Sequence, residues 1–311
     1  MKGCPCFFRQ RPEEVKPHRL YAFISVKRGT YPVKDMCNVL GVSESGYYRS
    51  LKEKQVLKKS ELLLVKIKEI IAEHPDNENY GVQRVHMALL LEGNEVSYST
   101  VYRIMKGNKL VKKAKRHPNG ITKEDMAAQK SENLINRDFS ADAPNKKWLT
   151  DITEVQCSDG KLYIAPVLDC FNGEIVGLAI DNNMRKELCI QAFENACRSR
   201  NAKGMIIHSD RGSQYTSKGF RDCLSRYGAI QSMSGTGKCY DNARMESFFA
   251  TLKKEKLYRL RTERYSMEYV KTVIFRYIMI YYNRYRIYTP NPGGLPPVIY
   301  RIKEEKRDKA A

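Results

Sequence analysis

The order of strand-like and helix-like segments between Trp148 and Leu257 limits the fold of this chain more than any other feature. Three segments with alternating or β-branched residues come first, and tight turns at 158–161 and 172–173 join them as hairpins. Helical segments then alternate with two short apolar strands. This order predicts an α/β fold, a mixed five-stranded sheet flanked by helices. The expected strands are 149–157, 162–168, 174–180, 205–208 and 230–233, and the expected helices are 186–200, 217–227 and 241–257.

The composition excludes several classes of protein. The 311 residues are 42% hydrophobic, which is enough to bury a core and argues against wholesale disorder. No run of about 18 apolar residues occurs, so no membrane span is expected, and the N-terminus has no apolar segment typical of a secretory signal. The nine cysteines form no C-x-x-C pair, so no zinc site is expected. Their scattered placement is typical of a reducing cytoplasm.

The net charge of +20 is concentrated in the flanks of the sequence. Residues 148–250 carry twelve basic and twelve acidic side chains, whereas residues 101–147 have a net charge of +7 and residues 251–311 a net charge of +9. Basic segments on both sides of a neutral block favour binding to a polyanion, because each neutralised phosphate releases counterions.

Two segments upstream of the expected sheet have the pattern of a helix-turn-helix unit. Residues 31–49 predict two helices that meet at Gly41, and they fit a DNA-binding unit and a plain helical hairpin equally well. The second segment predicts helices over 82–91 and 99–108, followed by the basic run 109–116. This combination favours DNA binding. The candidate DNA contacts in the second segment are Arg103, Lys106, Lys112 and Lys113.

Three acidic residues stand at positions where a sheet of this kind would bring them together. Asp151 lies in the first expected strand, Asp210 just past the fourth, and Glu246 in the last helix. The first and fourth strands are expected to be neighbours at the centre of the sheet, so the two aspartates meet and the helix supplies the third carboxylate. Each acid alone has an ordinary explanation as a cap, a turn residue or a solvated side chain. Their joint placement indicates a catalytic site.

Convergent carboxylates are the ligands that Mg²⁺ prefers. Two such ions, about 3.5–4 Å apart, hold the attacking and the leaving oxygen of an in-line phosphoryl transfer. One aspartate would bridge the two ions, and each remaining acid would hold one of them. Asp151 is the expected bridging residue. Water or a DNA 3′-hydroxyl attacks, so the protein need supply no covalent nucleophile.

The segments W-x-x-D-I-T, H-S-D-R-G-S-Q-Y and D-N-A-x-x-E-S-F-F resemble the three acidic motifs of DDE transposases and retroviral integrases. Thirty-five residues separate Asp210 from Glu246, which matches the spacing in that superfamily. The chain most resembles the second-reading-frame (orfB-type) transposase of the bacterial insertion-sequence family numbered three. The resemblance implies an RNase H-like, integrase-type core, Mg²⁺ or Mn²⁺ as cofactor, and strand cleavage and transfer at element ends. It also implies that the family's helix-turn-helix begins at Tyr80.

The residue pattern and this resemblance together predict five regions. Residues 1–56 form an N-terminal helical, helix-turn-helix-like region. Residues 57–116 form the DNA-binding helix-turn-helix region, and 117–145 form a linker with turn-forming residues. The catalytic core covers 146–262, and a basic C-terminal helix and tail covers 263–311.

Three more residues are candidate DNA contacts beside the acids. Lys253 lies seven residues after Glu246, two helical turns on, and therefore on nearly the same face. A Lys or Arg is common there in the family, and Lys253 resembles the residue that contacts DNA near the active site. Arg211 and Asn242, as neighbours of the acids in the motifs, either position substrate or support the loops.

The resemblance implies double-stranded DNA, at element ends and at the target, as the substrate of a homo-oligomer. In the family an upstream reading frame supplies a leucine zipper and a further helix-turn-helix, so an upstream-frame protein is an expected partner. A bacterial, nucleoid-associated place in the cytoplasm is expected. Two alternatives stay open, a non-catalytic DNA-binding regulator derived from a transposase and a nuclease on the same fold. RNase H-type nucleases usually carry a fourth acid, for which Asp169 is the candidate, although its surroundings favour loop chemistry.

Overall fold

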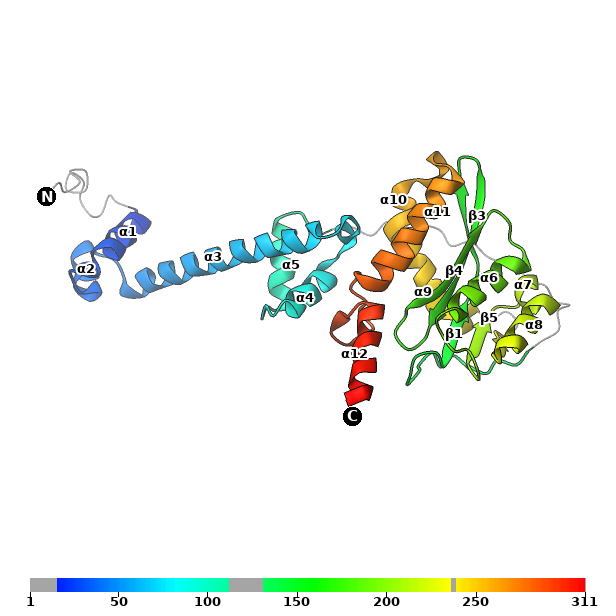
Figure 1. The fold of residues 1–311 in the computed structure, drawn as a ribbon. Coiled ribbons are helices and arrows are strands. Elements are labelled where there is room, and N and C mark those ends of the chain that lie inside the picture. The colour runs from blue at the N-terminus through cyan, green and yellow to red at the C-terminus, as the bar shows by residue number, and fades with distance from the viewer. Residues whose placement is uncertain (1–15, 112–130, 236–238, 311) are drawn as a thin grey trace. The chain divides into compact units, whose positions relative to one another are not determined.

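The computed structural model describes residues 16–111, 131–235 and 239–310 (Figure 1). The chain forms two compact units, Met1–Glu69 and Ile70–Ala311, and the division falls inside the long helix α3 (Glu44–Ala72). The expected boundary between residues 56 and 57 also lies inside this helix. The helix is continuous because residues 51–60 contain no glycine or proline and consist mainly of good helix formers.

The first unit contains α1 (Pro17–Lys27), α2 (Val33–Leu40) and the first part of α3. Its core is small, with Ile24, Met36, Cys37 and Tyr47 buried against one another. The expected helix-turn-helix pattern over residues 31–49 is therefore present as α2, a three-residue turn and α3.

The second unit begins with the end of α3, the short helix η2 (Pro75–Asn79) and a helix pair. The pair is α4 (Val82–Leu91) and α5 (Tyr98–Gly107), and both helices lie within one residue of their expected bounds. Ser97 caps α5 by accepting a hydrogen bond from the backbone N–H of Thr100. Val85, Leu89, Val101 and Met105 are buried.

A mixed sheet forms the centre of the second unit. The strand β3 pairs antiparallel with β4 on one side and with β1 and β2 on the other, and β1, β5 and β6 run parallel. This arrangement confirms the mixed α/β sheet expected from the sequence. The strands are β1 (Lys147–Thr150), β2 (Thr153–Cys157), β3 (Gly160–Asp169), β4 (Ile175–Asp181), β5 (Ile206–Ser209) and β6 (Ile230–Met233).

The sheet has six strands where five were expected, because the first expected strand is divided into β1 and β2. Both pieces pair with β3 in one continuous register, since Thr150 pairs with Val167 and Thr153 pairs with Ile164. This register brings Asp151 opposite Pro166, which has no N–H to donate. The carbonyl of Pro166 instead accepts a hydrogen bond from the Thr150 hydroxyl. The interruption therefore falls at the candidate catalytic aspartate.

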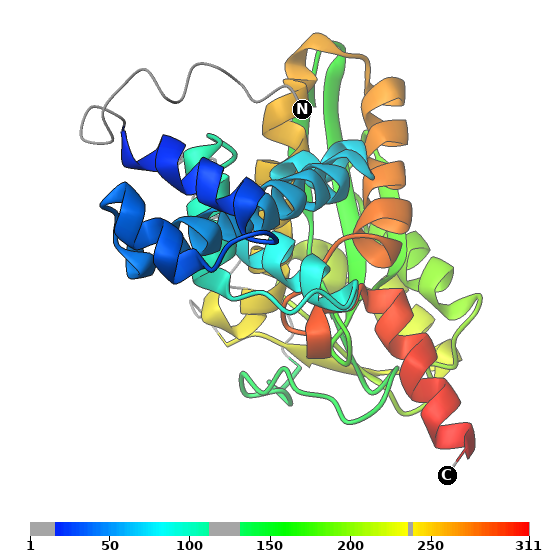
Figure 2. The ribbon, with the colours of Figure 1, turned by 90° about the vertical axis from the view of Figure 1, so that its left-hand side faces the viewer.

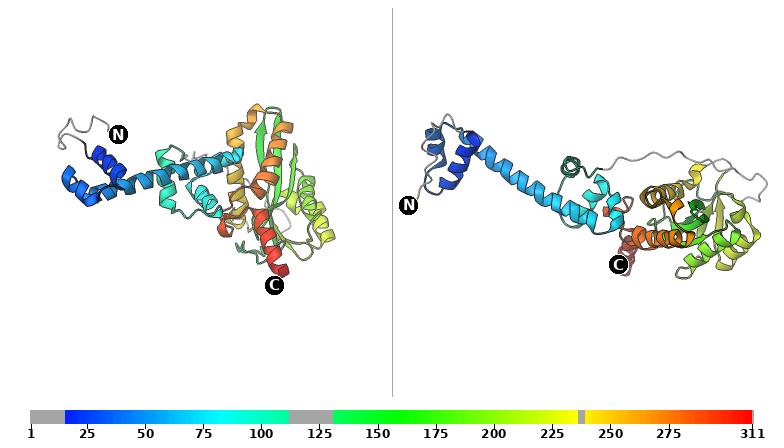
Figure 3. Two further views of the ribbon diagram at one scale, coloured as in Figure 1. Left: turned by 60° about the vertical axis from the view of Figure 1, so that its left-hand side comes forward. Right: turned by 90° about the horizontal axis from the view of Figure 1, so that it is seen from above.

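Helices cover both faces of the sheet. The large core cluster joins Trp148 and Val167 of the sheet to Phe193 of α6 and Phe220 of α8. Figures 1 and 3 show α6, α7 and α8 on this face of the sheet and α9 to α11 on the other face. Figure 2 shows α9 to α11 in front of the strands. The helices after β4 are α6 (Lys186–Cys197), α7 (Ser213–Thr216), α8 (Lys218–Tyr227), η3 (Cys239–Asn242), α9 (Ala243–Leu252), η4 (Lys253–Leu257), α10 (Tyr258–Leu260), η5 (Thr262–Arg264), α11 (Met267–Phe275), η6 (Arg276–Tyr282), η7 (Pro292–Gly294) and α12 (Pro297–Ala310).

Gly177 of β4 sets how closely α6 approaches the sheet. A Cβ atom built on Gly177 would collide with the carbonyl oxygen of Ala192 and lie 2.8 Å from the Cβ of Ala196. We expect Gly177→Ala to destabilise the fold by about 1–3 kcal/mol, because the helix backbone must move. Urea unfolding measures the loss. Gly29→Ala, at a position with no atom within 4 Å of the added carbon, is the matched control. Equal stability of both variants would contradict the close packing.

Candidate active site

Asp151 stands at the interruption between β1 and β2. The strand that carries it is held in the core by Trp148 and Leu149, both fully buried. The Thr150 hydroxyl also lies 3.1 Å from the hydroxyl of the buried Tyr215, which fixes the strand from the α7 side. The carboxylate of Asp151 accepts a hydrogen bond of 2.7 Å from the N–H of Ile152.

Asp210 comes one residue after the end of β5 and lies next to Asp151. Leu149 pairs with His208 in the parallel β1–β5 ladder, so both aspartates follow two residues after a paired position at the same edge of the sheet. The Asp210 carboxylate accepts a hydrogen bond of 3.0 Å from the N–H of Gly212. A Cβ on Gly212 would lie 3.1 Å from that same carboxylate oxygen, so a glycine suits this turn.

The two aspartates share an unfavourable electrostatic environment. Burial and the negative charges of Asp210 and Glu246 raise the pKa of Asp151, the Ile152 N–H and the Lys253 ammonium lower it, and the net result is a pKa of about 8. Burial also raises the pKa of Asp210. Carboxylates whose pKa values are strongly perturbed by burial and by neighbouring negative charges are characteristic of functional sites.

Glu246 is presented by α9, whose buried residues Met245, Phe248 and Phe249 anchor the helix. The glutamate itself is exposed, and its charge acts on Asp151. The structure therefore brings the three predicted acids to one edge of the sheet. The expected last helix, 241–257, continues beyond α9 as the π-helix η4, a form often found at functional sites.

The donor set suits divalent cations. Two half-buried carboxylates of like charge repel each other, and a bound cation would neutralise that repulsion. Within the described residues, no three His, Cys, Asp or Glu side chains converge as ligands of a single ion. The arrangement expected from the sequence requires only two carboxylates for each of two ions, with water and substrate oxygens completing the shell.

Lys253 is the first residue of η4, and its charge lowers the pKa of Asp151. The lysine predicted to lie on the Glu246 side of the helix therefore belongs to the neighbourhood of the acids. Arg211 donates a hydrogen bond of 2.6 Å from Nε to the carbonyl of Ser234, which ties the loop after β5 to the segment after β6.

Asn242 has contacts of the loop-supporting kind, one of the two roles expected for it. Its side chain is 5% exposed and donates a hydrogen bond of 3.2 Å to the carbonyl of Thr150. This bond connects the residue before α9 to the strand before Asp151, so the amide positions two parts of the site. Arg103 and Lys106 are exposed on α5, as a DNA contact requires. Lys112 and Lys113 lie outside the described residues.

Asp169 has the loop role that its surroundings favoured. It is 1% exposed, and its carboxylate accepts hydrogen bonds of 2.9 Å from the N–H groups of Asn145 and Phe171. Both carboxylate oxygens are thus used in holding the chain at the end of β3. The arrangement gives no support to a fourth metal-binding acid.

Sequence reasoning missed two polar groups beside the site, one buried and one half-buried. The imidazole of His208 is fully buried between the hydroxyls of Ser232 and Ser234, at 2.8 and 3.2 Å, and burial lowers its pKa to about 4. Arg244 of α9 donates a hydrogen bond to the carbonyl of Cys170 at 2.6 Å. The residues that His208 and Arg244 contact are far from them in sequence, so these hydrogen bonds could not be predicted before the fold was known.

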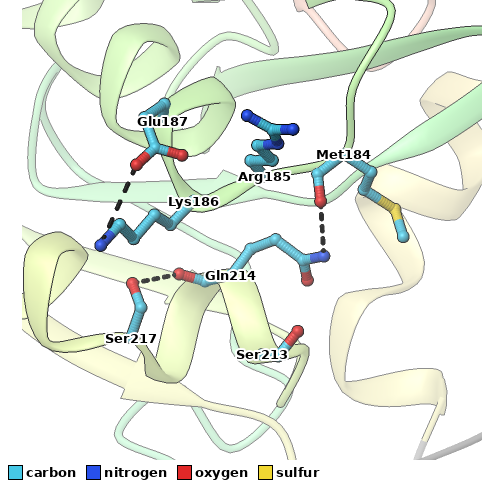
Figure 4. Close-up of a pocket in the computed structure, with 7 residues that line it drawn as sticks. All are labelled: Met184, Arg185, Lys186, Glu187, Ser213, Gln214 and Ser217. Atoms are coloured by element: carbon cyan, nitrogen blue, oxygen red, sulfur yellow. Dashed lines mark hydrogen bonds and ion pairs between the residues drawn. The ribbon is translucent and has the colours of Figure 1, made fainter.

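A shallow pocket of about 420 Å³ lies beside the Asp210 loop (Figure 4). The amide of Gln214 donates a hydrogen bond of 3.1 Å to the carbonyl of Met184 and links the two walls. The pocket is lined by Met184, Arg185, Lys186, Glu187, Ser213, Gln214 and Ser217.

Two segments of the chain, residues 141–239 and 246–304, match sequence profiles of the Integrase core domain, and residues 58–118 match the HTH-like domain. The first core segment contains Asp151 and Asp210, and the second begins at Glu246. These matches confirm the expected integrase-type, RNase H-like core and the helix-turn-helix region before it. Within the part of the chain that the structure describes, no helix has the length and apolarity of a membrane span.

Named relatives extend the matches over most of the chain. It is 37% identical over 269 residues to a 31 kDa protein of insertion element IS600 from Shigella sonnei, covering 86% of this chain and 98% of that protein. It is 32% identical over 287 residues to transposase InsF for insertion sequence IS3A of Escherichia coli K12, covering 91% and 98%. The HTLV-2 integrase catalytic core domain in complex with magnesium aligns with a TM-score of 0.40 and 19% identity, covering 51% and 97%. The chain therefore belongs to the IS3-family transposases of bacterial insertion sequences.

Proposed function

We propose that this transposase cleaves and joins DNA strands at the ends of an insertion sequence, with Asp151, Asp210 and Glu246 as ligands of two Mg²⁺ or Mn²⁺ ions. The observation that carries the proposal is the half-buried Asp151 beside Asp210, with the charges of Glu246 and Lys253 both acting on it. Asp169 is occupied by backbone N–H groups, which favours the three-acid transposase over a four-acid nuclease.

In this mechanism the side chains position substrate and metal and form no covalent intermediate. Asp151 would hold both ions, and Asp210 and Glu246 would each hold one of them. When bound, the ions supply a Lewis acid for the attacking and leaving oxygens of the phosphate. Lys253 contacts a DNA phosphate next to the scissile bond, since its positive charge acts on Asp151. Arg211 orders the loop behind Asp210 through Ser234.

The partner of this transposase is DNA. Double-stranded element ends and target DNA are the substrates of a homo-oligomer on the bacterial nucleoid, with an upstream-frame protein supplying a zipper and end recognition. Residues 146–262 form the catalytic core, residues 57–116 the DNA-binding region and residues 263–311 the basic C-terminal segment. The core and the helix pair α4–α5 belong to one compact unit.

A metal-dependent cleavage and joining assay tests the proposal. A labelled duplex carrying the end of the flanking element is incubated with the chain, with or without the upstream-frame product, in Mg²⁺ or in EDTA. We expect products only with Mg²⁺, and none with Asp210→Asn, whose DNA binding persists. Asp222→Asn, an exposed aspartate on α8, is the matched control. Binding without cutting or joining by the wild type would favour the regulator, and cutting without joining would favour the nuclease.

Exposed basic residues of α5 give a separate prediction for DNA binding. Arg103→Ala and Lys106→Ala remove phosphate contacts, so we expect each to weaken binding to all duplexes and to reduce the salt slope, d log K/d log[salt], by about 1. Titrations by fluorescence anisotropy at several salt concentrations measure this. Lys218→Ala on α8 serves as the control. An unchanged slope in both α5 variants would exclude α5 from the DNA interface.

A further inference from the structure

We propose that the first unit is a second DNA-reading helix-turn-helix, in which the start of α3 contacts bases and phosphates. The HTH-like match covers residues 58–118 and leaves α1, α2 and residues 44–57 of α3 without an assigned role. The inference rests on the proposed function, because it takes DNA as the substrate of the whole chain.

The first unit is built as a rigid support for the start of α3. Ile24 of α1, Met36 and Cys37 of α2 and Tyr47 of α3 are between 0% and 8% exposed and pack on one another. A Cβ on Gly46 would collide with the hydroxyl of Tyr21, so α1 lies directly against α3 at this glycine. A helix supported in this way can hold its outer residues in fixed positions.

The turn between α2 and α3 has the chemistry of a helix-turn-helix. Gly41 ends α2 in the left-handed region, with φ of 65°, and its N–H and that of Val42 return to carbonyls of the last turn of α2. Ser43 then accepts a hydrogen bond of 3.0 Å from the N–H of Gly46 at the start of α3. Only three residues separate the helices, as in units that place a second helix against DNA.

The outer face of α3 carries a stripe of DNA-contacting residue types. Ser45, Tyr48, Arg49 and Lys52 recur at helical spacing and are all exposed. We call these four residues the α3 stripe. The Tyr48 side chain is 53% exposed, and its ring lies edge-on to the buried Tyr47 with centroids 5.3 Å apart. A helix face that only contacts water does not need a large exposed aromatic side chain beside two cations. Tyr48 in this position therefore indicates a binding surface.

The positive charge of the first unit favours a polyanion as its partner. Residues 16–52 contain seven Lys and Arg residues and two acids, Asp35 and Glu44. Guanidinium and ammonium groups bind phosphates, while hydroxyl groups and Arg49 can reach base edges in a major groove. Double-stranded DNA offers both at the spacing of one helix face. An acidic protein surface offers the charges without the base edges.

Full-length chains and a duplex carrying the element end test the proposal. The stripe variant is Tyr48→Ala/Arg49→Ala/Lys52→Ala, and the matched control is Lys27→Ala/Arg28→Ala, which also removes two positive charges from exposed positions of the same unit. Circular dichroism checks that both variants are folded. DNase footprints and binding titrations are made with the element end and with a scrambled duplex of equal length.

We expect the stripe variant to bind the element end about 10–100-fold more weakly, with part of the footprint lost, while the control changes by less than about threefold. If both variants lost the same affinity for both duplexes, the effect would come from net charge alone, and the proposal would be overturned. A full footprint together with lost association with the upstream-frame product would make the stripe a protein surface. Mg²⁺-dependent cleavage by the wild type in the same buffers reports separately on the proposed function.

Discussion

Replacing Asp151 by Asn is expected to lower the rate of DNA cleavage and joining by about 10³-fold or more, which corresponds to about 4 kcal/mol of transition-state stabilisation. The same substitution is expected to make the metal-free chain more resistant to heat. Burial and the charges of Asp210 and Glu246 disfavour the Asp151 carboxylate, as its raised pKa shows. An amide of the same shape keeps the hydrogen bond from Ile152 without the repulsion.

The two effects are measured on one preparation. Strand-transfer kinetics with Mg²⁺ give the activity, and thermal unfolding in EDTA gives the stability, with about 2–4 °C expected for each kcal/mol of relieved repulsion. Asp222→Asn on α8 is exposed and is expected to change neither. A variant that loses both activity and stability would show that Asp151 holds the fold, and would remove the support for its place in a charged, metal-binding site.

Glu255→Gln is expected to lower the free energy of unfolding by about 3–5 kcal/mol, because it leaves the buried Arg286 and the half-buried Arg84 without their counter-charge. Glu255 lies in η4, two residues after Lys253. Its carboxylate lies 2.6 Å from Arg84 of α4 and 2.9 Å from Arg286, and it accepts a hydrogen bond of 2.8 Å from Tyr277. Its backbone carbonyl accepts the amide of Asn79 at 3.0 Å.

This cluster connects three parts of the second unit that are far apart in sequence. Arg84 belongs to the DNA-binding helix pair, Glu255 to the helix that follows Glu246, and Arg286 to the C-terminal segment. The Arg286 side chain is 7% exposed and that of Glu255 11% exposed. Loss of the carboxylate is therefore expected to loosen the helix pair from the core as well as to destabilise the fold.

Urea unfolding at several pH values measures the contribution of Glu255. Burial alone would raise the pKa of Glu255, but the hydrogen bonds and charges of Arg286 and Arg84 lower it to about 2. The unfolded chain binds this proton near pH 4.5 and the folded chain only near pH 2, so about 3 kcal/mol of stability is present above pH 4.5 and lost as the pH falls toward 2.

The difference between wild type and Glu255→Gln should therefore shrink over that range of pH. Glu263→Gln, at an exposed position in η5, is the control and is expected to stay within about 0.5 kcal/mol of the wild type. A pH-independent difference would show that packing, and not the charge of Glu255, holds the cluster together.

Much of the sheet could be predicted because periodicity is a local signal. The turn residues at 158–161 and 172–173 fixed the hairpins, and apolar runs fixed β5 and β6 near their observed bounds. The division of the first strand could not be predicted, because it depends on Pro166 standing opposite Asp151 in the folded sheet. The continuity of α3 from Glu44 to Ala72 was also not predicted, since residues 51–60 have weak apolar periodicity although their helix propensity is strong.

The identities and spacing of Asp151, Asp210, Glu246 and Lys253 were determined by the sequence itself, because the motifs around them are contiguous runs of residues. Their meeting was decided by the tertiary structure, since the β1–β5 register and the packing of α9 bring together side chains that lie up to about 100 residues apart. The role of Asn242 was decided in the same way, because burial against Thr150 is a property of the folded chain. The Glu255 cluster could not be predicted from the sequence, because a glutamate between lysines is expected to be exposed to solvent. Only the fold brings Arg84 and Arg286 into contact with its carboxylate.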